Sequence, residues 1–159
     1  MKTITKTINY LQMTALFLTA SLAGLAAAEN EKPFRGSIQA VETYNPQFPA
    51  LFVDSSGSGT ATYLGRFTVT SEFEVNLLTL AGSGSAHFIA ANGDSLFTEL
   101  TGQASPTGNP DVLSIVETYT ITGGTGRWAD ATGSFTAERL LDSVTGVTSG
   151  SFDGTIVIH

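Results

Sequence analysis

Residues 121–133 read Ile-Thr-Gly-Gly-Thr-Gly-Arg-Trp-Ala-Asp-Ala-Thr-Gly. They separate two runs, 112–122 and 134–141, in which apolar and polar residues alternate. A period of two predicts strands, and glycine tolerates the positive φ angles that a tight reversal of the chain needs. We therefore expect two antiparallel strands here, joined by a structural turn that is built on Gly123, Gly124 and Gly126.

The same alternation recurs along the chain, with Gly, Asn, Asp or Pro between the runs. The eight expected strands lie near 34–43, 59–64, 66–75, 84–91, 95–104, 112–122, 134–141 and 150–158. Asn92-Gly93 is the strongest short hairpin signal among the turns. An alternative for the second and third strands is one long strand bent at Gly65. We interpret 54–59 as a flexible polar loop and 45–49 as an irregular connection.

Strands that are joined by short connections usually pair antiparallel with their neighbours. Eight such strands make either a sandwich or an up-and-down barrel. We predict an all-β fold, an eight-stranded antiparallel up-and-down β-barrel, with Trp128 plugging the end that the glycine turn crosses. The interior of a barrel of this size is filled by side chains or holds one small ligand.

The first 28 residues have the pattern of a secretory signal peptide: Lys2 and Lys6, an apolar run at 16–26, and small residues at 26–28. The alternative is an uncleaved N-terminal anchor, but the run is shorter than the roughly 20 apolar residues of a membrane-spanning helix. Cleavage after Ala28 leaves 131 of the 159 residues, which suits a single domain at 29–159. We expect an exported protein, extracellular or periplasmic, with no stable membrane span after cleavage.

The composition excludes several classes of function. The chain has no cysteine, so disulfides, thiol catalysis and cysteine-ligated metals are ruled out. Beyond residue 28 the sequence has five basic and 14 acidic residues, a net charge of −9. Such an acidic protein repels phosphate backbones, and we expect no binding of nucleic acid.

No cofactor or metal site is expected. Residues 124–129 match the Gly-x-Gly-x-x-Ala nucleotide pattern, but the long helix and parallel strand that this motif needs cannot follow. His87 and His159 are 72 positions apart and lack metal-ligand spacing. His87 has no identifiable orienting partner and is interpreted as an ordinary wall or surface residue. Asp54 alone supplies too few oxygens for calcium.

Glu117 is the most interesting titratable residue, because it shares one strand face with apolar residues and Tyr119. If that face points inward, the carboxyl group could bind the polar head of a ligand or act as an acid or base. One alternative is that Arg127 or Arg139 pairs with it. Another is that the opposite face, with Val116, is the inward one.

Two further residues complete the candidate ligand-binding set with Glu117 and Tyr119. Glu99 alternates with Phe97 on its predicted strand, and Tyr63 could donate its hydroxyl group to a ligand. Aromatic side chains on strands more often serve packing alone. No residue is assigned a catalytic role.

Several segments near the end of the chain resemble the allene oxide cyclase and dirigent barrel superfamily. They are the run Ile121 to Gly126, the following Arg-Trp pair, Gly133, the upstream Glu117-Thr118-Tyr119 and the last strand. The specific similarity covers the last third of the chain. The whole chain beyond residue 28 also resembles small exported bacterial proteins with this kind of barrel. The resemblance implies an apolar interior and, as in the plant members, association into homo-oligomers. No catalytic residue is carried over from the family.

Three functions remain open at this point. The first is a non-catalytic exported barrel that binds a small hydrophobic ligand or acts as an interaction or structural module. The second, by analogy with the plant cyclases, is an isomerase or cyclase acting on a hydrophobic substrate. The third is an oligomeric scaffold with a plugged barrel. A cavity that reaches Glu117 favours the first two, converging polar groups within it favour the second, and an interior filled by Phe and Ile favours the third.

Overall fold

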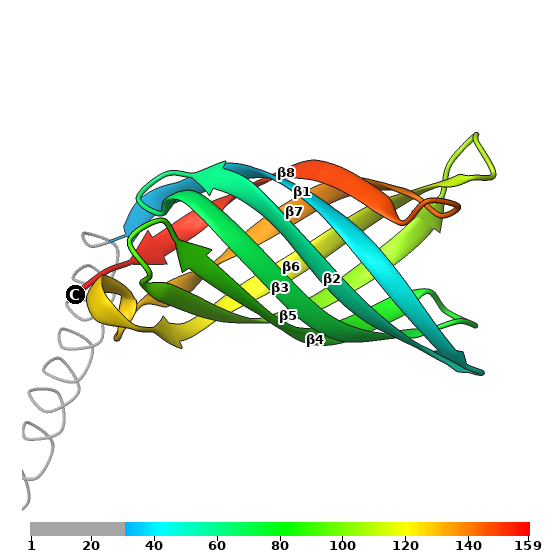
Figure 1. Cartoon of the computed structure of the whole chain (residues 1–159), viewed down its shortest axis with the longest axis horizontal. Coiled ribbons are helices and arrows are strands. Elements are labelled where there is room, and N and C mark those ends of the chain that lie inside the picture. Colours follow the sequence, from blue (N-terminus) through cyan, green and yellow to red (C-terminus); the bar gives the residue numbers. More distant parts are fainter. Residues whose placement is uncertain (1–30) are drawn as a thin grey trace, which may run out of the picture. The chain divides into compact units, whose positions relative to one another are not determined.

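The structure of the protein is a computed structural model that describes residues 31–159. Eight strands form a closed barrel in chain order (Figure 1), and consecutive strands pair antiparallel. They are β1 (Glu31–Gln47), β2 (Ala50–Ala61), β3 (Gly65–Asn76), β4 (Ala81–Ala90), β5 (Ser95–Pro106), β6 (Val112–Gly124), β7 (Thr132–Asp142) and β8 (Val147–Val157). The prediction of an all-β, eight-stranded antiparallel barrel is confirmed.

Strand β2 corrects two expectations from the sequence. The second strand was expected at 59–64, but β2 covers 50–61 and residues 62–64 form a turn. Residues 54–59 are not a loop but the middle of β2, paired along their length with β1 and β3. The glycines there are required by packing: a Cβ on Gly57 would lie 2.6 Å from the Cβ of Ala40, and one on Gly59 would lie 2.6 Å from the ring of Phe67. A strand of Ser and Gly thus has the composition of a loop although close neighbours hold it in the sheet.

The connections around β2 are tighter than expected. Strand β1 continues to Gln47, so that only residues 48–49 form the turn into β2. Gly65 does not bend one long strand. It begins β3 with φ +69° after a turn at 62–64, and β2 and β3 form a hairpin.

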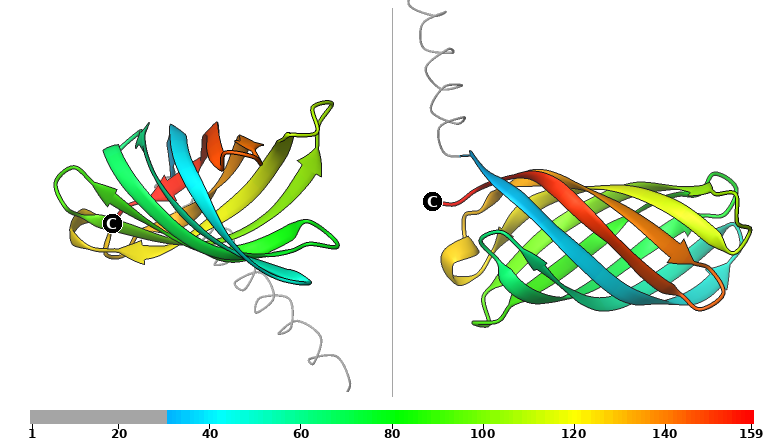
Figure 2. Two further views of the ribbon diagram at one scale, coloured as in Figure 1. Left: turned by 45° about the vertical axis from the view of Figure 1, so that its right-hand side comes forward. Right: turned by 90° about the horizontal axis from the view of Figure 1, so that it is seen from above.

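Alternation along each strand decides which side chains point into the barrel. On β6 the buried side chains are Ile115, Glu117, Tyr119 and Ile121, whereas Val116 is 46% exposed. The alternative in which the Val116 face points inward is therefore wrong. Figure 2 shows the strands strongly inclined along the barrel, as closure of an eight-stranded sheet requires.

An aromatic cluster fills one half of the barrel. Phe135 lies at its centre, with ring centroids 4.7 Å from Tyr119, 4.9 Å from Phe152, 5.3 Å from Phe34 and 6.0 Å from Phe88. Rings at these separations attract one another in addition to burying apolar area. This half of the interior is packed by side chains.

The glycine turn covers the end of the barrel next to this cluster, which we name the closed end. The backbone reverses at Gly123 (φ +127°) and Gly126 (φ +57°), and a short 3-10 helix, η1 (Gly126–Trp128), follows. The side chain of Trp128 is fully buried, and a Cβ on Gly124 would lie 2.8 Å from the Cβ of Trp128. The glycines therefore let the chain approach closely while Trp128 fills the space beneath it.

The predicted signal peptide at 1–28 lies outside the described residues. Within residues 31–159 the structure has no helix that is long and apolar enough to cross a membrane.

Candidate ligand-binding site

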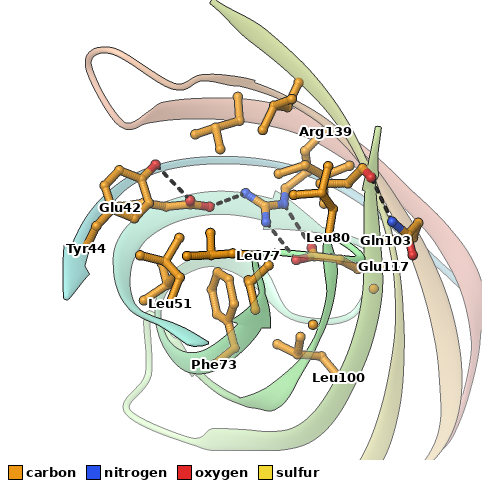
Figure 3. Close-up of a pocket in the computed structure, with 18 residues that line it drawn as sticks. Glu42, Tyr44, Leu51, Phe73, Leu77, Leu80, Leu100, Gln103, Glu117 and Arg139 are labelled. Atoms are coloured by element: carbon orange, nitrogen blue, oxygen red, sulfur yellow. Dashed lines mark hydrogen bonds and ion pairs between the residues drawn. The ribbon is translucent and has the colours of Figure 1, made fainter. Parts of the chain in front are cut away.

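A cavity of about 140 Å³ occupies the half of the barrel opposite the closed end. Figure 3 shows the side chains that line it. The cavity lies at the end of the turns 48–49, 77–80, 107–111 and 143–146, which we name the open end. Most of its wall is apolar. The apolar lining residues are Leu51, Val53, Phe73, Val75, Leu77, Leu80, Leu100, Ala104, Leu113, Ile115 and Leu141.

Several of the inward side chains around the cavity are only partly packed. Phe73, Val75 and Leu113 point into it but remain half-buried rather than buried. Gly102 adds space of a specific kind, because a Cβ at this position would lie 2.7 Å from Cγ of Glu117. The missing side chain of Gly102 thus makes room for Glu117.

One wall of the cavity is an ionic network centred on Arg139 of β7. Its guanidinium donates to both carboxylate oxygens of Glu117 on β6, from Nε (2.9 Å) and Nη2 (2.7 Å). Nη1 donates to Oε1 of Glu42 on β1 (2.9 Å) and to Oγ1 of Thr148 on β8 (2.8 Å). Four strands thus contribute, and the three charged side chains are at most 5% exposed. Figure 3 shows the guanidinium between the two carboxylates.

Two tyrosines extend the network. Tyr119 donates its hydroxyl to Oε2 of Glu117 (2.9 Å), and Tyr44 donates to Oε2 of Glu42 (3.1 Å). The pKa of each tyrosine is raised well above its ordinary value. Burial is the main cause, and the adjacent carboxylate is the second. Burial alone would lower the pKa of Arg139, but the hydrogen bonds and charge of Glu117 outweigh it and raise that pKa. At neutral pH the tyrosines are hydrogen-bond donors and Arg139 is a cation.

The structure brings together two of the four residues singled out from the sequence. Glu117 and Tyr119 are buried and joined by a hydrogen bond. Arg139 pairs with Glu117, which is one of the alternatives left open above.

The other two candidates lie outside the barrel. Glu99 is exposed on the outer face of β5, because its neighbours Thr98 and Leu100 are the inward residues. Tyr63 is 44% exposed in the β2–β3 turn, with the ammonium of Lys32 5.7 Å from its ring centroid. Neither can contact a ligand in the cavity. Glu99 was expected to point inward because it alternates with Phe97, but Phe97 is an aromatic residue on the outer face.

Sequence reasoning missed Glu42 and Tyr44 and gave Arg139 only the role of a partner. A signal was available for Glu42 and for Arg139. Glu42 continues the apolar inward face of β1, and Arg139 continues that of β7 between Ala137 and Leu141. A charged residue on an otherwise apolar strand face is the same pattern that drew attention to Glu117.

His87 takes no part in this site. Its Nε2 hydrogen-bonds to Oγ of Ser95 (2.8 Å), and its ring lies 4.9 Å from that of Phe97, which faces outward. Among residues 31–159 no group of three or more His, Asp or Glu side chains is arranged to hold a metal ion.

No protein-family model matches this chain, and the search of curated proteins found no match either.

Proposed function

We propose that this chain is an exported, non-catalytic barrel protein that binds one small hydrophobic or amphipathic molecule at its open end. The observation that carries the proposal is the mostly apolar cavity with its polar groups gathered on one wall. Small-molecule sites typically have this composition, in which apolar surface gives affinity and a few polar groups fix orientation. A cavity of about 150 Å³ can hold a benzene ring, so a larger ligand would extend through the open end.

The surroundings of the open end support the same proposal. Three of its four turns carry an apolar side chain that is largely exposed: Phe48 (75%), Leu78 (71%) and Val144 (74%). Exposed apolar groups that gather in one place mark sites of interaction more often than bare surface does. An apolar molecule reaching the open end would meet these side chains first.

Catalysis by analogy with allene oxide cyclases is the second candidate, and the converging polar groups favour it. Five polar side chains, Glu42, Tyr44, Glu117, Tyr119 and Arg139, gather beside the cavity. General acid–base catalysis works best when the pKa of the group lies near the operating pH. The pKa values of both tyrosines and of Arg139 are raised, and thus lie even further above neutral pH than usual. We therefore rank binding above catalysis.

A plugged scaffold fits only half of the molecule. The aromatic cluster fills the closed half, as that hypothesis requires, but the open half retains the cavity. Association into homo-oligomers, which the resemblance to dirigent-like barrels implies, remains compatible with a ligand site inside each barrel.

The test is a titration of the purified full chain with toluene, a neutral apolar probe, followed by the NMR signals of methyl groups. The methyl groups of Leu100 and Ile115 line the cavity, whereas Ile156 is buried at the closed half. We expect saturable shifts at the first two and none at Ile156. Ala104→Leu should abolish them, and Ala91→Leu, at an exposed position, should not. Absence of saturable shifts in the unmodified protein would overturn the proposal.

A complementary measurement is native mass spectrometry of the protein purified gently from the export fraction of its own host. A reproducible added mass that is lost in Ala104→Leu would identify the class of the natural ligand. Recovery of the chain from the cytosol with residues 1–28 intact would contradict the proposed export.

A further inference from the structure

The network beside the cavity has unequal numbers of opposite charges. Glu42 and Glu117 both face the single guanidinium of Arg139, at 2.9 Å and 2.7 Å. The network therefore contains two acidic side chains and only one basic side chain. Buried charges without a partner are costly, and a second cation would balance the second acidic side chain.

The other basic residues at 31–159 lie elsewhere. Arg35 pairs with Asp153 on the outside, and the guanidinium of Arg127 lies 4.5 Å from the ring of Trp128 at the closed end. Lys32 stacks on Tyr63, and Arg66 is exposed. Among the described residues, Arg139 is thus the only basic side chain that lines the cavity.

The unused hydrogen-bonding capacity of the network consists mainly of acceptors. Four of the five N–H groups of Arg139 are engaged with Glu42, Glu117 and Thr148. Glu117 accepts three hydrogen bonds and Glu42 accepts two, although a carboxylate offers about four acceptor positions. Both tyrosine hydroxyls donate their hydrogen to a carboxylate, so their oxygen lone pairs remain free to accept. Glu42 has the larger spare capacity of the two carboxylates.

From this charge and donor count we propose that the ligand of this cavity is a small amphipathic amine. Its ammonium group would bind at Glu42 and Tyr44, and its apolar body would fill the space between Leu51, Phe73 and Leu100. An ammonium supplies up to three donors and a second positive charge. A carboxylate head, as in a fatty acid, would meet two carboxylates and a guanidinium that is already engaged. This inference rests on the proposed ligand-binding function and names its ligand class.

The experiment compares three probes that share one apolar body: 2-phenylethylamine, 2-phenylethanol and 3-phenylpropanoate. Their dissociation constants for the purified full chain are measured by calorimetry at pH 7 in a phosphate buffer free of amines. We expect the amine to bind about tenfold more tightly than the alcohol, as charge-assisted hydrogen bonds are roughly twice as strong as neutral ones. The carboxylate should bind most weakly.

Glu42→Gln tests the assignment to this carboxylate. It removes the second acidic side chain and keeps the shape, so the preference for the amine over the alcohol should fall to near unity. Glu99→Gln is the matched control, because it makes the same change in net charge on the outer face of β5 and should leave the preference unchanged. Circular dichroism and the unfolding temperature verify that both variants fold.

The outcomes separate this inference from the function on which it rests. If none of the three probes binds, the ligand-binding function itself fails. If the probes bind without preference, or the carboxylate binds best, the cavity holds ligands but the amine assignment is wrong. The ranking in the unmodified protein decides this even if Glu42→Gln does not fold. A preference for the amine that survives in folded Glu42→Gln would refute the role given to Glu42.

Discussion

The two halves of the barrel share one sheet and one alternation of side chains, yet they differ in what fills them. In the closed half, Phe88, Phe135 and Trp128 are at most 3% exposed and belong to one packed hydrophobic cluster. In the open half, the apolar inward side chains are mostly aliphatic, several are half-buried, and a buried ionic network takes the place of an aromatic cluster. The closed half has the features of a stability element and the open half those of a binding site.

This contrast shows that one barrel can combine a densely packed half with a half that keeps a cavity. Tight packing of large apolar side chains contributes most of the stability of a domain. Buried ion pairs contribute little net stability, because the cost of removing charges from water offsets their attraction. The packing of the filled half can therefore stabilise a barrel whose other half has a cavity and a polar wall, and which that other half alone would not stabilise.

The largest effect on stability should come from Phe135→Ala in the closed half. Phe135 packs against four aromatic rings, and its truncation should lower the free energy of unfolding by about 3–5 kcal/mol. Phe73→Ala in the open half should cost about 1–2 kcal/mol, because the ring is half-buried beside an existing cavity. Urea denaturation measures both. Equal losses would contradict the division into two halves.

Removal of the cation should come next in size. Arg139→Met leaves Glu42 and Glu117 buried without a cation beside them and should lower the free energy of unfolding by about 3 kcal/mol or more. Arg35→Met is the control, since Arg35 and Asp153 form an exposed pair of the kind that contributes about 0–1 kcal/mol. Urea denaturation at pH 7 compares the two variants. Similar losses would mean that the network in the open half is no more important than a surface ion pair.

A smaller effect, with a distinct pH dependence, is expected from Tyr119→Phe. Loss of the hydrogen bond to Glu117 should cost about 1 kcal/mol at pH 7. The pKa of Tyr119 is raised in the folded protein, so above about pH 10 the unfolded chain loses this proton while the folded one retains it. Stability therefore falls as the pH rises past 10, and the fall should be shallower in the variant.

Denaturation series at pH 7 to 11 check this, with the exposed Tyr63→Phe as a control that should leave the stability at pH 7 unchanged. An alkaline slope that is identical in Tyr119→Phe and the unmodified chain would show that Tyr119 does not retain its proton.

The smallest effect on stability should come from filling the cavity. Ala104→Leu adds volume where space exists and should change the free energy of unfolding by less than about 1 kcal/mol. Ala137→Leu adds the same groups beside the aromatic cluster, where Ala137 is 2% exposed, and should cost about 1–3 kcal/mol. Thermal unfolding measures the pair. A costlier Ala104→Leu would mean that the open half is as tightly packed as the closed one.

The strand count and the antiparallel order were predictable from the sequence, because period-two alternation and turn residues are local properties. Residues 54–59 were not, since a strand of Ser and Gly has no local signal that distinguishes it from a loop. Only the neighbouring strands, which leave no space for a Cβ at Gly57 or Gly59, explain this composition. The site was predictable in part: Glu117 was identified by its apolar neighbours, and the same signal at Glu42 was overlooked.

The sequence by itself determined most elements of this protein: the alternating strands other than β2, a glycine turn before Trp128, no cysteine and an acidic balance. Only the tertiary structure decided which face of each strand points inward, and with it that Glu117 is buried while Glu99 is exposed. Alternation specifies two faces but does not name the inner one. Likewise, Glu42 and Arg139 are 97 positions apart, and only closure of the barrel brings them together, because it sets β1 beside the last strands of the chain.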